Sequence, residues 1–236
     1  MKKYVIALFT LVVLASCSRE RISPTGSVIT ESRDVDAFSA ISIHNGFRVK
    51  ITMDSTESVA VEAHENVQRY VNVKQVGNFL EIEKDRWVSF SSDVEVTVLI
   101  SAKTLERISG SAGTMMEVEG TLSAEDLKLV LSAEGNFKGT IEVETFEADL
   151  SGGSTLELTG NTGHCDLEIS GGGAAEGFDF VTDTFEADLS GGSTVKMSIN
   201  GAMDVSASGG SRVTYKGSGV VEREQLSGGS TIIKAE

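Results

Sequence analysis

Proline, cysteine, tryptophan and basic residues are all scarce in this sequence of 236 residues. It has one proline, two cysteines and one tryptophan, and its 20 Lys and Arg face 35 Asp and Glu, a formal net charge of −15. So few cysteines exclude a disulfide framework and a cysteine-based zinc site. The acidity argues against a nucleic-acid-binding protein, which needs basic residues for phosphates. With 40% hydrophobic and 23% charged residues, the chain is neither disordered nor a multi-span membrane protein.

The first residues are typical of a targeting signal. Lys2 and Lys3 precede an apolar run from Val5 to Leu14, and this run is shorter than the roughly 20 residues that a membrane-spanning helix needs. We therefore predict a signal peptide over residues 1–16.

The signal ends in Leu14-Ala15-Ser16-Cys17, which resembles a bacterial lipobox. We predict lipidation of Cys17, because several acyl chains on one residue make a lasting membrane anchor. The alternative is an ordinary secretory signal with an incidental cysteine. Residues 17–34 are then the lipidated cysteine and a polar tether. The expected location is the cell envelope, at the outer membrane. Ser18-Arg19-Glu20-Arg21 lacks an acidic export signal, so both the periplasmic and the surface-facing side stay open.

A repeat of 19 residues dominates the second half. The decapeptide FEADLSGGST occurs at 146–155 and again at 185–194. The first serines of this and its weaker copies are Ser132, Ser151, Ser170, Ser190, Ser208 and Ser227, with steps of 19, 19, 20, 18 and 19. Apolar residues alternate with polar ones before each serine, which indicates strands with one buried face. A helical solenoid would show a 3.6-residue period, and a propeller blade needs roughly 40 residues.

These features predict an all-β fold: a single-stranded, right-handed parallel β-helix with coils of about 19 residues. The β-helix domain spans 35–236, with regular coils over 106–236 and an irregular N-terminal part over 35–105 that covers the first open edge. In that irregular part, we expect strands at Val59–Ala63, Phe79–Glu83 and Val94–Ile100 and a short helix at Glu65–Tyr70.

Three features together resemble a known family. They are the lipobox, the segment FSAISIHNGFRVKI at Phe38–Ile51 and the tandem SGGST coils. The chain from about residue 35 to 236 is similar to the putative auto-transporter adhesin, head GIN domain family of Bacteroidota. Asn45-Gly46-Phe47 is the nearest match to the tripeptide of the family name. The resemblance implies a β-helical envelope protein, and the adhesin label of the family rests on fold likeness and not on a mapped site.

The repeated serines suggest a nucleophile, but Gly-x-Ser-x-Gly is absent, and a nucleophile needs one activated copy beside a base. We interpret them as corners in which serine hydroxyls hydrogen-bond along the stack and glycine supplies positive φ. The histidines His44, His64 and His164 occupy unrelated positions without metal-ligand spacing. We expect no catalytic residue and no firm metal ligand.

Cys165 shares its repeat position with large apolar residues. Five residues before successive corners stand Leu127, Phe146, Cys165, Phe185 and Met203. A small residue between two phenylalanines suits interdigitated packing, so a buried cysteine is a better interpretation than a reactive thiol. The turns also lack the aspartate and the period of the calcium-binding nonapeptide repeat.

Acidic residues recur at two outward positions of the repeat. Four residues before each corner stand Glu147, Asp166, Glu186 and Asp204, and two before stand Asp149, Glu168 and Asp188. Stacked coils would align them as two adjacent columns, with Lys128 and Arg223 at the two ends. One interpretation is a solvated acidic face. The other is a binding face for calcium or for a basic partner.

Three classes of function stay open at this point. A β-helix polysaccharide lyase or hydrolase acts through a few acids, or through Arg or Lys bases, placed uniquely in one groove. Here the acids recur in columns, and basic residues are scarce among the coils. Trp87 and Phe90 form either a sugar-stacking platform or packing for the first coil. We expect a non-catalytic envelope lipoprotein, an adhesin or scaffold; the alternatives are a carbohydrate-active enzyme and a glycan-binding carrier. The expected partners are the membrane and an unknown protein or glycan, not nucleic acid. No cofactor is expected except possible calcium, and the oligomeric state is open.

Overall fold

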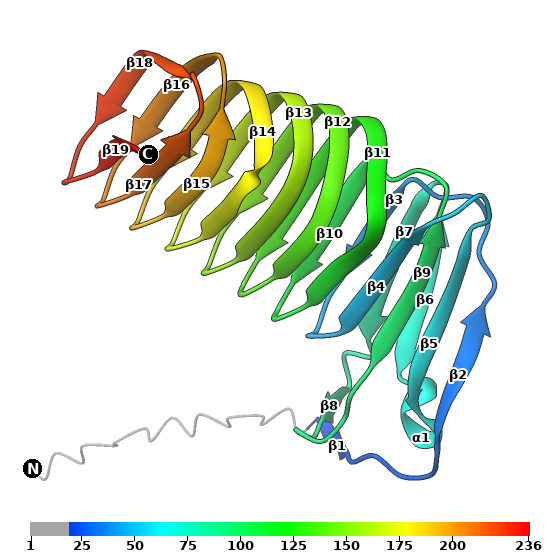
Figure 1. Cartoon of the computed structure of the whole chain (residues 1–236). Helices are drawn as coiled ribbons and strands as arrows, with labels where there is room; N and C mark the ends of the chain where they lie inside the picture. The colour runs from blue at the N-terminus through cyan, green and yellow to red at the C-terminus, as the bar shows by residue number, and fades with distance from the viewer. Residues whose placement is uncertain (1–18) are drawn as a thin grey trace, which may run out of the picture.

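The computed structural model describes residues 19–236 (Figure 1). The predicted signal peptide, residues 1–16, and the predicted lipidation site, Cys17, lie outside the described residues. The described chain is nearly all β-structure and forms a solenoid of about seven stacked parallel turns, with coils about 19 residues apart. The predicted β-helix is therefore confirmed.

The N-terminal part consists of an irregular mixed sheet and a separate two-stranded sheet. Its elements are β1 (Glu20–Ile22), β2 (Val28–Arg33), β3 (Ala40–Ile43), β4 (Arg48–Met53), β5 (Ser58–His64), α1 (Glu65–Gln68), β6 (Val71–Val76), β7 (Phe79–Lys84), β8 (Val88–Phe90) and β9 (Thr97–Ala102). The expected strands at 59–63 and 79–83 are present. The third begins at Thr97 rather than Val94, and the helix is one turn long.

The regular coils follow. Their strands are β10 (Arg107–Ser111), β11 (Met115–Ser132), β12 (Asn136–Leu150), β13 (Thr155–Ile169), β14 (Ala174–Leu189), β15 (Thr194–Ile199), β16 (Ala202–Ala207), β17 (Arg212–Lys216), β18 (Val220–Leu226) and β19 (Thr231–Lys234). Each coil contributes to two parts of one continuous sheet, before and after its glycine corner. We call the part before each corner the first sheet and the part after it the second sheet.

The register stacks like residues from coil to coil. Leu127 pairs with Phe146, Phe146 with Cys165, Cys165 with Phe185, and Phe185 with Met203, all in parallel. All five side chains are buried, so the predicted core column is confirmed. The ring of Phe180 meets Phe146 edge-on, with centroids 5.9 Å apart. Interdigitated large and small side chains fill the space between the sheets.

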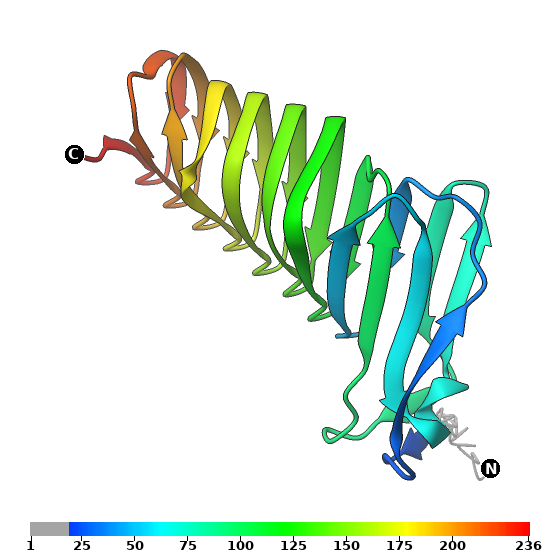
Figure 2. The same ribbon diagram turned by 45° about the vertical axis from the view of Figure 1, so that its right-hand side comes forward.

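The glycine corners stack along one edge of the solenoid (Figure 2). Gly152 and Gly153 have φ of 62° and 75°, a region that glycine enters without steric cost. The expected serine bonds differ in detail: the buried hydroxyl is that of Ser154, and it donates to the carbonyl of Ser151 in its own coil at 2.6 Å. Ser193 makes the same bond within its coil. The second serine of the motif therefore closes the corner. The Ser193 hydroxyl also contacts the Ile169 carbonyl of the preceding coil at 3.2 Å, and the Ser208 hydroxyl contacts the Leu189 carbonyl at 3.5 Å, so the expected bonds along the stack are present as well.

Antiparallel strands cover the N-terminal end of the coils. β7 and β9 pair in parallel with β3 and β4 and so begin the stack. β6 then lies antiparallel on β7, β5 on β9, and β2 on β5. These strands use the backbone groups that the first coil would otherwise present to other chains.

The C-terminal coil is protected by its sequence. β18 pairs with β16 through a register shift between Met203 and Asp204. Glu224 pairs with Val205 and so stands at an inward position of the repeat, yet it is exposed. A bulge and an inward-placed charge both discourage the addition of another strand.

The predicted tether at 17–34 is wrong for most of its described residues. Ile22 of β1 is only 6% exposed, and β1 pairs with β8. β2 pairs with β5 over six residues. Both strands depend on partners that lie far along the chain, so the polar composition of this segment did not reveal them.

Candidate functional site: the acidic face

The first sheet carries the two predicted acidic columns. Glu147, Asp166, Glu186 and Asp204 pair in sequence across four strands. Beside them, Asp149, Glu168 and Asp188 pair across three of these strands. We call these seven carboxylates the acidic face. The alternation of β12, β13, β14 and β16 turns their side chains outward, because the intervening residues are buried in the core.

Basic residues pair with both ends of the acidic face. The Lys128 ammonium lies 3.1 Å from Glu147 and 3.2 Å from Asp149, and these two carboxylates raise the pKa of Lys128. At the other end, the Arg223 guanidinium lies 3.2 Å from Asp204. Both contacts are solvent-exposed ion pairs, which contribute little stability.

The centre of the acidic face has no such partner. Within residues 19–236, no Lys or Arg pairs with Asp166, Glu168, Glu186 or Asp188. Partial burial and then the charge of Glu186 raise the pKa of Asp166, while His164 opposes the shift. The centre therefore carries uncompensated negative charge, which strengthens its interaction with any cation that approaches.

A shallow groove of about 240 Å³ crosses this centre toward the C-terminal coils. It is lined by Asp166, Glu186, Asp188, Asp204 and Arg223, among others. In the part of the chain that the structure describes, no three acidic, histidine or cysteine side chains come together closely enough to hold a metal ion. The regular spacing of the coils thus distributes the carboxylates along a line and does not gather them around a point.

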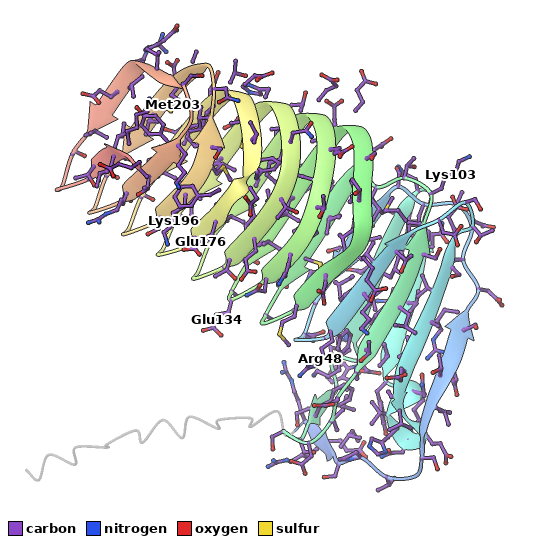
Figure 3. All side chains as sticks on the ribbon, in the orientation of Figure 1. Arg48, Lys103, Glu134, Glu176, Lys196 and Met203 are labelled. Atoms are coloured by element: carbon purple, nitrogen blue, oxygen red, sulfur yellow. The ribbon has the colours of Figure 1, made fainter. Side chains whose placement is uncertain are left out.

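The second sheet carries a charged column that our sequence interpretation missed. Its members are Lys50, Glu117, Lys138, Glu157, Glu176 and Lys196, which pair in this order. Three are basic and three are acidic, and Lys196 lies 2.8 Å from Glu176 (Figure 3). From Glu117 on, each stands six residues after a corner serine or its equivalent, so the same repeat register would have revealed them. Positive and negative charges are equal in number in this column, whereas negative charges predominate on the acidic face.

A second groove, of about 490 Å³, runs along this balanced column. Phe178 borders it and is 36% exposed, because β14 contains a register shift between Gly177 and Val181. The Lys216 ammonium lies 5.2 Å from the ring centroid of Phe178. That irregular coil is also the one whose serine step is 20 residues rather than 19.

The three histidines do not converge. His44 lies 2.6 Å from the hydroxyl of Ser111 and 3.1 Å from that of Ser42. His64 contacts the Gly26 carbonyl, and His164 contacts Thr184. The contact between His44 and Ser111 joins positions 67 residues apart, and among the described residues no carboxylate hydrogen-bonds to this imidazole.

Two further sequence candidates differ in exposure. Cys165 is fully buried, and burial raises the pKa of its thiol far above the usual range, so the reactive thiolate is disfavoured. Trp87 is 66% exposed, whereas Phe90 packs against the core and lies under the Lys84 ammonium. The two aromatics therefore have different environments.

No helix in the described part of the chain is both long and apolar enough to cross a bilayer. Residues 37–219 match the model of the family described as putative auto-transporter adhesin, head GIN domain. A search of curated proteins finds no match.

Several solved structures share the fold. A putative adhesin from Bacteroides fragilis aligns with a TM-score of 0.83 at 20% identity, covering 91% of this chain and all of its own. A putative lipid binding protein from Parabacteroides distasonis aligns with a TM-score of 0.72 at 13% identity, covering 92% and 100%. A putative adhesin from Parabacteroides merdae gives 0.66 at 15% identity, again covering 92% and 100%. At these identities the likeness establishes the fold alone.

Proposed function

Since this chain belongs to the putative auto-transporter adhesin, head GIN domain family, we propose that it is a non-catalytic, lipid-anchored module of the cell envelope that binds a basic partner. Cys17 is the proposed anchor, at the outer membrane. The acidic face is the proposed binding surface. The observation that carries this proposal is the contrast between the unpaired centre of the acidic face and the balanced column on the second sheet.

The geometry favours an extended partner over a single ion. The four central carboxylates occupy two neighbouring positions on each of two adjacent strands, and strands in a sheet lie about 4.8 Å apart. A basic protein segment could place several ammonium or guanidinium groups along such a line. Complementary charge of this kind accelerates association and selects partners more than it raises affinity.

A catalytic role is less well supported. His44 and Ser111 form a hydrogen bond, but a serine nucleophile also needs an oriented base and a pocket for the substrate. None of the grooves described above includes either residue. The recurrent corner serines likewise have a structural use in the hydrogen bonds of the corner.

The anchor is tested by fractionation of cells. Cys17→Ser should move the protein from the membrane fraction to the soluble periplasm or block its processing. Unchanged membrane association after washing would refute lipidation. Protease treatment of intact cells would then distinguish a surface-exposed adhesin from a periplasmic one.

The binding surface is tested with polylysine as the probe, titrated at several salt concentrations. The variant Asp166→Asn/Glu168→Gln/Glu186→Gln/Asp188→Asn should lose most of the binding, because it removes the unpaired charges. The control Glu117→Gln/Glu157→Gln/Glu176→Gln removes three acids that face lysines, one charge fewer than the test variant, and it should keep the acidic-face interaction. Equal losses in both variants would show that only net charge matters.

Calcium is distinguished from a basic partner by thermal melting. A cation that binds only the folded chain raises the melting temperature by mass action. The comparison uses EDTA, millimolar CaCl₂ and NaCl of matched ionic strength. A calcium gain beyond the NaCl control that disappears in the four-site variant would assign the acidic face to calcium instead.

A further inference from the structure

The only tryptophan of the chain lies on the outside of the N-terminal part. Trp87 is 66% exposed in the turn between β7 and β8, and the Arg86 guanidinium lies 4.9 Å from its ring centroid. The turn is held in place, because the Trp87 amide donates to Asp85 at 2.8 Å and its carbonyl accepts from the Glu20 amide at 3.2 Å. A large aromatic side chain is thus presented to solvent from a fixed backbone.

Basic residues gather around this turn. Arg19 and Arg21 lie at β1, which pairs with β8, and burial together with the charge of Arg19 lowers the pKa of Lys84. The Arg69 guanidinium lies 4.7 Å from the ring centroid of Tyr70, and the Tyr70 carbonyl accepts from the Asp85 amide at 2.8 Å. We call residues 19–22, 69–70 and 84–87 the basic tip.

The composition of the basic tip is opposite to that of the rest of the chain. It holds five basic residues, Arg19, Arg21, Arg69, Lys84 and Arg86, against two acidic ones, Glu20 and Asp85. The whole sequence has 35 acidic and 20 basic residues. Since acids dominate elsewhere, this concentration of positive charge beside exposed aromatic surface is a local property of the tip.

The basic tip also lies where the described chain begins. The 18 residues that precede Arg19, including Cys17, join the structure at β1. The solenoid extends away from β1 and β8 (Figure 1), so the acidic face lies on coils remote from the tip. Positive charge therefore stands at the end nearest the proposed anchor.

We propose that the basic tip docks on a lipid bilayer with anionic headgroups, with Trp87 in the interfacial layer and the surrounding arginines on the phosphates. Tryptophan favours this layer because its ring is amphipathic. Basic side chains near an anionic surface add electrostatic attraction. The position of the docking surface rests on the proposed lipid anchor, which would hold the tip close to the membrane.

The charge of the remaining chain makes this contact directional. An anionic bilayer repels the acidic face and attracts the basic tip, so the chain approaches the bilayer with the tip first. Acyl chains and a basic patch together give firmer attachment than either one alone. Tip docking would thereby fix the direction in which the solenoid leaves the membrane.

The test uses the chain from Arg19 to Glu236 without acyl groups. This part contains every described strand and the whole described core, and its circular dichroism is measured first to establish that it is folded. The probe is a vesicle of phosphatidylglycerol and phosphatidylethanolamine, compared with phosphatidylcholine alone. Because Trp87 is the sole tryptophan, its emission should move to shorter wavelength and be quenched by brominated lipid only with the anionic vesicles. High salt should reverse the shift.

Variants locate the contact. Each arginine is expected to contribute about a factor of five to vesicle partition. Arg19→Ser/Arg21→Ser should therefore weaken partition about 25-fold. The matched control Lys138→Ser/Lys196→Ser removes two charges from the second sheet and should leave partition unchanged. Trp87→Ala is followed by vesicle flotation and should also bind less.

Either of two results would overturn the proposal: unchanged Trp87 emission with anionic vesicles, or equal weakening by the tip and control pairs. Circular dichroism of each variant confirms that it is folded. A failed vesicle test leaves the fractionation of Cys17→Ser unaffected, because the chain used here carries no anchor. The lipid anchor and the docking of the basic tip are therefore tested independently.

Discussion

Replacing Asp166 by asparagine should stabilise the protein at neutral pH. Asp166 lies between Glu147 and Glu186 in one column, and its pKa is raised first by partial burial and then by Glu186. At a spacing of about 4.8 Å, two unit charges repel by about 0.8 kcal/mol in water. Screening over a Debye length of about 8 Å at physiological ionic strength roughly halves this energy.

The two neighbours do not contribute equally. Glu147 is compensated by Lys128 at 3.1 Å, whereas Glu186 pairs with no basic side chain in the described chain. The expected gain for Asp166→Asn is therefore about 0.5–1 kcal/mol, in keeping with the small energies of exposed charges. For a chain of this size, that gain raises the melting temperature by about 1–4 °C.

The gain should depend on pH with a definite sign. A carboxyl whose pKa is raised on folding holds its proton more tightly in the native state, so its contribution to stability falls as the pH rises above the unfolded value of 3.8. The difference between Asp166→Asn and wild type should be largest near pH 7 and vanish below pH 3.8. Differential scanning calorimetry across this range measures it directly.

The control is Glu147→Gln, which removes a carboxylate that is paired with Lys128. This variant should gain nothing or lose a few tenths of a kcal/mol, because an attractive contact disappears with the repulsive one. The reasoning is refuted if Asp166→Asn melts below wild type at pH 7. It is equally refuted if the gain persists undiminished in 1 M NaCl.

Three further predictions concern the core and the corners. Phe146→Ala should cost about 3–5 kcal/mol in urea unfolding because it leaves a cavity, whereas Phe178→Ala, at an exposed position, should cost far less. Ser154→Ala should lower the free energy of unfolding by about 1 kcal/mol, because the corner hydrogen bond is lost. Ser151→Ala should lower it less, because Ser151 makes that bond with its carbonyl and not with its hydroxyl. The reverse order would contradict the corner geometry. Cys165 should react with a thiol reagent only on unfolding, and rapid labelling of the native chain would show that the coils open there.

The regular coils were predictable because each residue position repeats. Once the serines fix a period of 19, alternation assigns Phe146 to the core and Asp166 to the surface, and parallel stacking then places Asp166 beside Glu186. This register follows from the period of the sequence and needs no knowledge of which distant segments meet. The acidic columns followed from the same periodicity that predicted the fold.

The charged column of the second sheet was within reach of the repeat register, but the other features that sequence reasoning missed depend on contacts between distant segments. β2 becomes a strand because β5 lies beside it, and its own pattern is too polar to show this. His44 contacts Ser111 because β3 pairs in parallel with β10, and the two residues directly follow the paired Ile43 and Gly110. The basic tip likewise joins residues 19–22 to 84–87 through pairing of β1 with β8. No local propensity indicates which of these segments will meet.

The distribution of charge links stability to the proposed function. Opposite charges on neighbouring strands stabilise a sheet, and Lys196 and Glu176 form such a pair on the second sheet. The same solenoid keeps Asp166 beside Glu186 on the first sheet at a cost that asparagine would remove. Departures from local rules concentrate at functional sites, and rigid coils cannot rearrange to separate these carboxylates. A bound basic partner would supply the positive charge that no side chain of the described residues provides there. Its contacts are therefore expected to be strongest at the centre of the acidic face.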